Sequence, residues 1–221
     1  MKCEILDLGL VKYSYADDTQ RGILEGIKTN TMENTLILAE FFPVFTKGRK
    51  GSLDNLLVSV DFLKEKGIDF CAADRGGDIT FHNPGQLIAY PIFNLSNIKK
   101  DLAWYLRTLE EVIIKTLLKY GVCAGRKAGF TGAWVGDKKI ASIGIGVSRW
   151  ASYHGLSVNV NNDLSYFDFI NPCGIKNCRM ASVSELKGAV VNMDEFKNEL
   201  VRQFKTIFGI KVNAETTAAV A

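Results

Sequence analysis

"RGGDITFHNPGQLIAYPI", residues 75–92, constrains the architecture of this chain more than any other segment. The alternation of polar and apolar residues after its glycine pair predicts a β-strand. Because successive side chains of a strand point to opposite faces, Asp78, Thr80 and His82 share one face. The two apolar residues between them share the other face, which we expect to lie in a core.

The same segment contains a turn motif. Pro84 and Gly85 fit the second and third positions of a type II β-turn, where proline presets φ and glycine takes a positive φ. Together with the apolar run that follows, this turn predicts a hairpin over 79–92. Gly76 and Gly77 carry no side chains, so another group can approach the backbone closely there. The segment is either an ordinary hairpin with a hydrogen-bonded histidine or the wall of an active site.

The rest of the chain predicts strands with a few interspersed helices. We expect helices over 13–29, 97–121 and 191–209, the last two ended by Gly121 and Gly209. We expect strands over 34–46 with a break at Pro43, over 132–147 around a Gly-Asp turn, and over 155–161; residues 51–70 predict a short helix, a turn at Gly67 and a strand leading into Cys71. No linker or internal repeat is evident. The pattern favours one α/β or α+β domain on a mixed sheet, over 1–212, with a frayed tail at 213–221.

Composition excludes several classes of protein. Hydrophobic residues make up 47% and charged residues 23% of the 221 residues, which is ordinary for a soluble domain. No apolar run reaches the roughly 18 residues that span a bilayer, and the N-terminus lacks a signal-peptide pattern, so we expect a cytoplasmic protein. A net charge of +3 is too weak to argue for nucleic acid. The basic clusters at 46–50 and 137–139 are either solvated surface or a docking patch for an acidic partner.

The cysteines argue against both disulfides and zinc. Their odd number and irregular spacing do not suit a disulfide framework, and two histidines are too few for a typical zinc site. The cysteines are Cys3, Cys71, Cys123, Cys173 and Cys178. We expect mostly buried thiols, one of which is a candidate reactive group.

"INPCGI", residues 170–175, holds the best candidate thiol. Pro172 keeps the chain extended and Gly174 permits a sharp turn after Cys173. A cysteine on such a constrained loop has backbone N–H groups nearby that could stabilise an oxyanion. The alternatives are that Cys173 is buried and inert, or that Cys178 is the nucleophile.

"DKKIASIGIGVS", residues 137–148, offers a cation. Lys139 at the start of a strand could lower the pKa of a nearby thiol, or it could be a hairpin-end lysine in water. Strand alternation predicts Ser142 and Gly144 on the face opposite Lys139, where small residues leave room for a ligand. His154, at the start of the next strand, is either a second imidazole of the site or a core residue.

Taken together, these blocks resemble a known enzyme family. "RGGDITFHNPGQLIAYPI", "KKIASIGIGV", "HGLSVNV" and "INPCGI" occur in the order and at the spacings of the octanoyl-acyl-carrier-protein:protein octanoyltransferases, or lipoyl(octanoyl) transferases. The resemblance runs from about residue 5 to residue 210. Two departures are Asn83, where the family usually has glycine, and residues 40–49, where we expect a histidine soon after the glutamate.

The resemblance implies the fold of biotin and lipoate protein ligases and a Cys/Lys acyltransferase site. Cys173 matches the family's nucleophile, and Lys139 matches the lysine that lowers the cysteine pKa and transfers protons. The matching acyl-binding residues are Arg75, Gly76, Gly77, Asp78, Ile79, Thr80, Phe81, His82, Ser142, Ile143, Gly144, Gly155, Leu156 and Ser157. The implied reaction needs no cofactor and no metal.

The implied reaction has two steps and two protein partners. Octanoyl moves from the phosphopantetheine arm of acyl carrier protein to the cysteine, and then to a lysine of lipoyl domains in 2-oxoacid dehydrogenase complexes or the glycine cleavage H protein. We expect a monomer. Three alternatives share parts of this pattern: an ATP-dependent lipoate or biotin ligase, a non-catalytic acyl-binding protein, and a Cys-His hydrolase that uses His82 or His154.

Overall fold

The computed structural model describes residues 1–176 and 178–210, so the expected tail at 213–221 lies outside the described residues. The helices are α1 (Tyr13–Lys28), α2 (Val60–Glu65), α3 (Leu102–Lys119), α4 (Val183–Lys187) and α5 (Met193–Phe208). The strands are β1 (Cys3–Val11), β2 (Asn34–Phe41), β3 (Val44–Lys47), β4 (Asp69–Ala72), β5 (Ile79–His82), β6 (Gln86–Ile92), β7 (Gly125–Lys127), β8 (Phe130–Val135), β9 (Lys138–Ser148), β10 (Ala151–Asn159) and β11 (Arg179–Met180).

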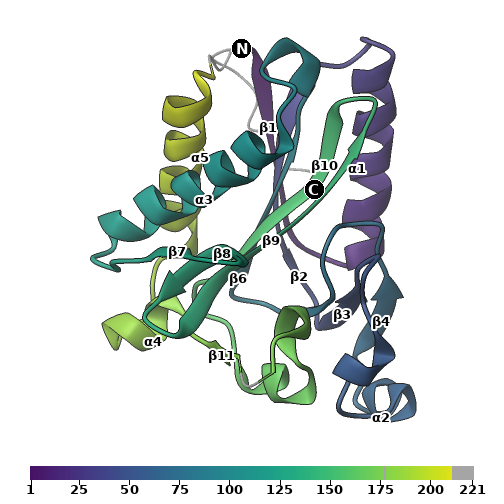
Figure 1. The fold of residues 1–221 in the computed structure, drawn as a ribbon, viewed down its shortest axis with the longest axis vertical. Coiled ribbons are helices and arrows are strands. Elements are labelled where there is room, and N and C mark those ends of the chain that lie inside the picture. The colour runs from purple at the N-terminus through teal and green to yellow at the C-terminus, as the bar shows by residue number, and fades with distance from the viewer. Residues whose placement is uncertain (177, 211–221) are drawn as a thin grey trace.

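Most of these strands form one large sheet. Its hydrogen-bonded order is β1-β2-β6-β10-β9-β8-β7, and β11 pairs with β9. The β1–β2 and β9–β11 pairs are parallel, whereas the other neighbours are antiparallel. Figure 1 shows helices on both sides of this sheet, which confirms the expected α+β fold with a mixed central sheet.

Alternating residues of the central strands divide between two cores. Leu36 and Leu38 of β2 pack into a core that includes buried residues of α3 and α5. Ile37 and Ala39 of the same strand pack into a second core with buried residues of α1. One face of the sheet is therefore covered by α3 and α5, and α1 covers the other face.

The segment at 75–92 joins the large sheet to a small one. β5 pairs with β3 in a three-stranded sheet of order β4-β3-β5, whereas β6 pairs with β2 and β10 in the large sheet. The type II turn is supported: Gln86 N–H donates to Asn83 C=O at 3.1 Å, and Gly85 has φ of +87°. The hairpin prediction is wrong, because the turn carries the chain from one sheet to the other.

Several local predictions are confirmed, and the start of one helix is corrected. Pro43 separates β2 from β3, and these strands also belong to different sheets. α3 begins later than expected, because the Asp101 side chain accepts a hydrogen bond from Trp104 N–H and caps the helix there. Gly121 and Gly209 follow α3 and α5 with positive φ, as expected for helix-ending glycines. Among the described residues, no helix has the length and apolarity needed to cross a membrane.

Candidate active site

Cys173 and Lys139 are in direct contact. Lys139 Nζ donates to Cys173 Sγ at 3.1 Å, and Ser142 Oγ lies 4.0 Å from the same sulfur. Lys139 is only 2% exposed, whereas Cys173 is partly exposed. A lysine held this close to a cysteine is the kind of setting in which reactive cysteines occur. The pair is therefore a candidate for an activated nucleophile.

A β-bulge brings Lys139 to the face that Ser142 occupies. In the β8–β9 pairing, Trp134 lies opposite Lys139 and Ala133 lies opposite Ala141, so Ile140 is an extra residue. Ile140 and Ala141 both point into the core shared with α3 and α5. Strand alternation is shifted by one residue there. The expectation that Ser142 lies on the face opposite Lys139 is therefore wrong.

Cys173 lies on a strained turn. Cys173 has φ of 57° and ψ of 24°, a left-handed conformation that costs a non-glycine residue about 1–3 kcal/mol. Gly174 follows with φ of +71°. The amides of Gly174 and Ile175 donate to Asn171 C=O and Pro172 C=O at 2.9 and 3.1 Å, so these two N–H groups are not free to stabilise an oxyanion.

Neighbouring segments hold this turn in place. Asn171 N–H donates to Asn55 C=O at 2.9 Å, and Asn55 Nδ2 donates to Asp78 Oδ2 at 2.7 Å. Leu57 N–H donates to Phe169 C=O at 2.8 Å. Asp78, which was expected in the acyl-binding wall, therefore helps to hold the turn that carries Cys173, through its hydrogen bond with Asn55.

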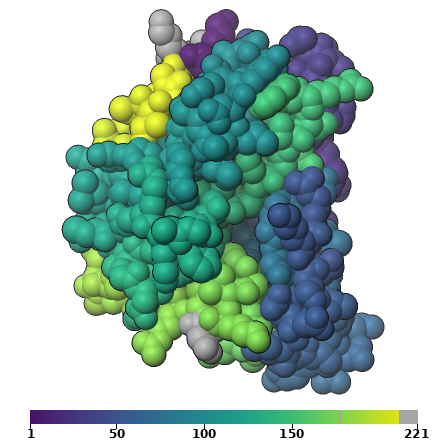
Figure 2. Space-filling view, in the orientation of Figure 1, coloured from purple at the N-terminus to yellow at the C-terminus, as the bar shows by residue number. Residues whose placement is uncertain are grey.

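A pocket opens between the large and the small sheet, next to Cys173. The space between its walls, together with the open solvent at its mouth, is about 410 Å³. Its lining residues are Arg75, Gly76, Gly77, Thr80, His82, Tyr90, Ser142, Ile143, Gly144, Gly155, Leu156, Ser157 and Cys173. Figure 2 shows the blue part of the chain, with the small sheet, lying against the green part that carries the nucleophile loop.

The expected wall residues thus fall into two groups. Thr80 and His82 face the pocket, as their shared strand face predicts. Ile79 and Phe81 lie on the other face of β5 and are buried in the core of the small sheet. The glycine pair does permit a close backbone approach, because Gly76 N–H donates to Ile145 C=O on β9 at 2.8 Å.

Arg75 is a buried cation in the pocket wall. It is 9% exposed, and its guanidinium donates to neutral acceptors only: Gly76 C=O at 3.1 Å, and the carbonyl and hydroxyl of Thr46 at 2.7 and 2.8 Å. Its Nε has no partner, and no carboxylate of a described residue lies within ion-pair distance. Burial lowers the pKa of Arg75, against the opposing effect of the nearby Cys173. Its positive charge therefore acts on the pocket.

His82 is fixed as a neutral side chain. Nδ1 lies 2.6 Å from Gln86 Oε1, which can only accept, and Nε2 lies 3.3 Å from Thr46 Oγ1. Burial lowers the pKa of His82 to about 3, against the opposing effect of the Gln86 hydrogen bond. With both ring nitrogens occupied, His82 orients the pocket wall and is poorly placed to act as a base for Cys173.

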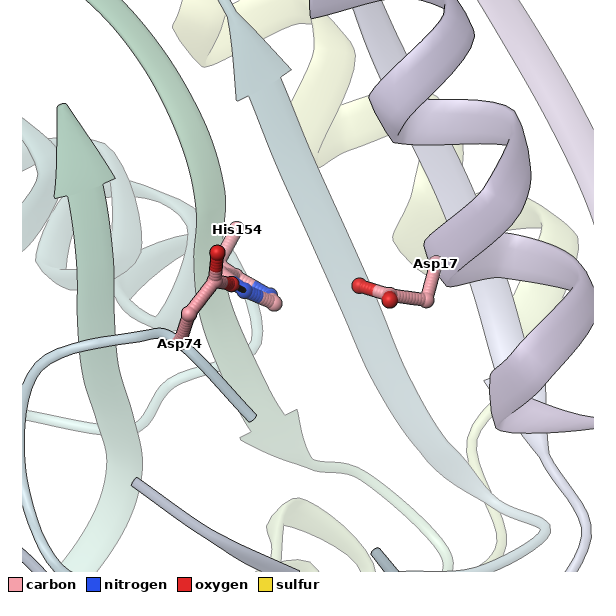
Figure 3. A group of neighbouring side chains, drawn as sticks. All are labelled: Asp17, Asp74 and His154. Atoms are coloured by element: carbon pink, nitrogen blue, oxygen red, sulfur yellow. Dashed lines mark hydrogen bonds and ion pairs between the residues drawn. The ribbon is translucent and has the colours of Figure 1, made fainter. Parts of the chain in front are cut away.

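His154 belongs to a separate polar cluster. Its Nε2 lies 2.8 Å from Asp74 Oδ1, and its Nδ1 lies 3.1 Å from Gln20 Nε2, which also donates to Asp17 at 2.7 Å. Figure 3 shows the Asp17 carboxylate, from α1, facing the Asp74–His154 pair. These three residues offer ligand atoms within 4.8 Å of one another, but the hydrogen bonds already account for the groups. We call this cluster the α1 brace, since it ties α1 to Asp74 and β10.

Cys178 is the other candidate nucleophile near the site. Burial raises the pKa of the Cys178 thiol, although Lys139 acts in the opposite direction. Cys178 Sγ lies 3.9 Å from Arg179 C=O. Burial also raises the pKa of Cys3 to about 12. Of these cysteines, Cys173 alone contacts a lysine within the described residues.

Sequence patterns missed two aromatic residues of the site. Tyr90 lines the pocket, although it lies on β6, beyond the turn. The Trp134 ring lies 5.7 Å from Lys139 Nζ and 4.5 Å from Lys127 Nζ. It therefore holds Lys139 by a cation–π contact. Only the alternation within β6 could have placed Tyr90 on the pocket face, and only if the pairing of β6 were known.

Asn83, one of the departures from the family pattern, has a visible role. Its Nδ2 donates to Asp163 C=O at 3.0 Å, which ties the turn to the segment after β10. Gly85 N–H donates to Glu40 Oε2 at 2.8 Å, so the same turn is also fixed to β2. The other departure places Phe41 directly after Glu40, and its ring packs against His82 with centroids 5.6 Å apart.

Three comparisons place the chain among known proteins. The model of the lipoyl protein ligase A/B catalytic domain matches residues 12–205. An octanoyltransferase of Caldanaerobacter subterraneus subsp. tengcongensis is 45% identical over 209 residues, covering 94% of this chain and 91% of the relative. The crystal structure of a lipoate-protein ligase A bound with ATP has a TM-score of 0.77 at 19% identity, covering 99% of this chain and 90% of that one. The biotin protein ligase of Aquifex aeolicus has a TM-score of 0.56–0.57 at 13–15% identity, which confirms the expected fold relationship.

Proposed function

The chain belongs to the lipoyl protein ligase A/B catalytic domain family, and we propose that it transfers an octanoyl group from octanoyl-acyl carrier protein to a lysine of lipoyl domains. The observation that carries this proposal is the 3.1 Å contact between Lys139 Nζ and Cys173 Sγ at the mouth of a pocket. Relatives that are 42% and 45% identical to this chain are octanoyltransferases, which supports octanoyl as the transferred group.

The first step forms a thioester on the enzyme. The Cys173 thiolate attacks the carbonyl carbon of the carrier-bound thioester, and a new S–C bond replaces the bond to the carrier sulfur. The leaving carrier thiolate takes a proton from the Lys139 ammonium. Lys139 is then a neutral amine next to the acyl-enzyme, and the carrier departs with a free thiol.

The second step forms the amide and restores the site. The neutral ε-amine of the acceptor lysine attacks the thioester carbon, and the Cys173 thiolate leaves. Lys139 accepts the proton that the new amide nitrogen loses, so the ammonium–thiolate pair is regenerated. Because a thioester is converted into a more stable amide, the reaction runs downhill without ATP.

Arg75 provides a second positive charge during both steps. No carboxylate within ion-pair distance neutralises its guanidinium among the described residues, and the pocket that it lines also contains Cys173. Negative charge develops on the cysteine sulfur and on the carbonyl oxygen in the transition states. A buried cation stabilises both more strongly than it would in water.

The protein partners follow from this reaction. The donor is acyl carrier protein, and the acceptors are lipoyl domains of 2-oxoacid dehydrogenase complexes and the glycine cleavage H protein, which reach the same mouth in turn. Arg49, Lys50 and Lys176 are exposed basic residues in the segments around the mouth, and they suit an acidic carrier. We propose that residues 1–212 act as one catalytic domain, in a cytoplasmic monomer that needs no cofactor.

Intact-mass analysis tests the proposal. Incubation with octanoyl-acyl carrier protein, without ATP, should give a covalent octanoyl adduct that hydroxylamine removes. Cys173→Ala should give no adduct, whereas the matched variant Cys178→Ala should give the full adduct. A strict ATP requirement, or an adduct that persists in Cys173→Ala, would refute the proposal.

A further inference from the structure

The pocket crosses three neighbouring strands of the large sheet. Ser142, which contacts Cys173, lies on β9, and Gly155 lies on β10. Tyr90 lies on β6, on the far side of β10. All of them line the same pocket, so its long direction runs across the strands from Cys173 towards Tyr90.

The span of this path matches the length of the proposed acyl group. Neighbouring strands lie about 4.8 Å apart, so two steps from β9 to β6 cover about 10 Å. An extended octanoyl chain has seven carbon–carbon bonds of about 1.5 Å, which cover about 9 Å in a zigzag. A chain that starts beside β9, at Cys173, would therefore reach across β10 to β6, the strand that carries Tyr90.

The inner end of the pocket is closed by packed aromatic rings. Tyr90 is 5% exposed, and its ring packs edge-on against His154 and Phe41, with centroids 5.5 and 6.2 Å away. Phe41 is fully buried and packs in turn against Tyr13 at 5.7 Å. These residues belong to the core beneath α1, so a longer chain has no open space ahead of it.

Phe41 fills the space behind Tyr90 with an apolar ring. It follows Glu40 in the segment that departs from the family pattern, and its ring contacts Tyr13, His82 and Tyr90. Within the described residues, the buried hydroxyl of Tyr13 has no hydrogen-bond partner.

We propose that Tyr90, held from behind by Phe41, is the floor of the acyl pocket and limits the transferred chain to about eight carbons. This inference rests on the proposed acyl transfer. Each buried CH₂ strengthens binding about fourfold, so burial alone favours ever longer chains. A fixed floor reverses that trend, because the ninth and later carbons must displace a packed ring.

Competition between acyl donors tests the floor. Hexanoyl-, octanoyl-, decanoyl- and dodecanoyl-carrier protein are mixed with the enzyme, and the thioester adducts are counted by intact mass. The wild type should favour octanoyl over hexanoyl by about sixteenfold, since two CH₂ groups are gained, and should lose dodecanoyl. A wild type that forms more dodecanoyl than octanoyl adduct would overturn the inference.

Two variants locate the limit at Tyr90. Tyr90→Val should raise the dodecanoyl-to-octanoyl ratio by at least about tenfold, and Tyr90→Leu by less, because they open different volumes. Tyr90→Phe keeps the ring and is the matched control, with an unchanged ratio. If Tyr90→Val does not fold, Tyr90→Leu and the wild-type series still test whether Tyr90 limits the length of the acyl chain. Octanoyl adducts with an unchanged ratio would refute the floor alone, whereas the absence of any adduct on the wild type would refute the proposed function.

Discussion

The two ends of the pocket are built in opposite ways. At the mouth, a partly exposed cysteine with a left-handed backbone meets a buried ammonium group. At the inner end, Tyr90 and Phe41 lie in a close-packed aromatic core within regular strands. The mouth combines backbone strain with charge, as reactive sites often do. The inner end is rigid and apolar, as a surface that limits the length of an alkyl chain must be.

Because the two ends differ in this way, substitutions at each end should have different effects. The loss of a charge at the mouth should alter the rate and its pH dependence. A change in ring size at the inner end should alter the choice of acyl chain and leave the chemistry in place. Of the wall residues between the two ends, His82 should affect folding stability, whereas the charge of Arg75 should affect the rate.

The largest effect is expected at the mouth, from Lys139→Met. Octanoyl transfer should fall about 10³-fold, because the thiolate loses its cation and both proton transfers lose their carrier. Steady-state transfer to a lipoyl domain measures this loss. The rate at which Cys173 is alkylated, followed by peptide mapping, should also fall.

Lys138→Met is the matched control for Lys139. Lys138 lies next in sequence, but its Nζ pairs with Glu185 at 2.9 Å on the surface. Its loss should change the rate by less than about twofold. If Lys139→Met retained a tenth of the wild-type rate, the mouth would owe its reactivity to other groups.

The wall residue His82 should make stability depend on pH. Its pKa is about 3 in the folded protein but about 6.5 in an unfolded chain, so acid protonates the unfolded chain first. The contribution of neutral His82 to the free energy of unfolding is complete above pH 6.5 and should fall by about 3 kcal/mol at pH 4. Urea unfolding at pH 7, 5.5 and 4 measures this loss.

The comparison for this prediction is His82→Asn. His154 also has a pKa lowered by burial, so some acid sensitivity should remain in the variant. The slope of unfolding free energy against pH should nevertheless be shallower in His82→Asn than in the wild type. Equal slopes would mean that His82 titrates normally in the folded protein.

Arg75→Gln should have a smaller effect, about tenfold on the acylation rate. One unit charge in the pocket contributes on the order of 1–2 kcal/mol to the thiolate and the oxyanion at an effective dielectric constant near 20. The rate constant should fall more than the KM rises, and the alkylation of Cys173 should slow. Arg75→Lys keeps the charge and should restore most of the alkylation rate, which a purely structural role of Arg75 would not predict.

The smallest effect is expected from the α1 brace. Asp74→Ala removes the acceptor of the 2.8 Å hydrogen bond from His154, and should lower the unfolding free energy by about 1 kcal/mol. Octanoyl transfer should stay within about threefold of the wild type. Asp18→Ala, on the exposed side of α1, is the control. A rate loss as large as that of Arg75→Gln would place the brace within the catalytic machinery.

Much of this fold was predictable because its signals are local. Alternation over 79–82 gave the correct two faces of β5, and the glycines after α3 and α5 marked the correct helix ends. The hairpin at 79–92 was wrong because a turn motif specifies the bend and not the partners of its two strands. Those partners are chosen by packing between residues far apart in sequence.

The amino-acid sequence was enough to predict the candidate chemistry and the local geometry: a cysteine between proline and glycine, a lysine before a strand, and a glycine pair that permits close approach. How these parts meet depends on the packing of the whole chain. The bulge at Ile140 turns Lys139 towards Cys173, and the pairing of β6 with β10 puts Tyr90 at the end of the pocket. The physical reason is that side-chain patterns report one strand's own periodicity, whereas bulges and strand neighbours are fixed by long-range packing of the whole core.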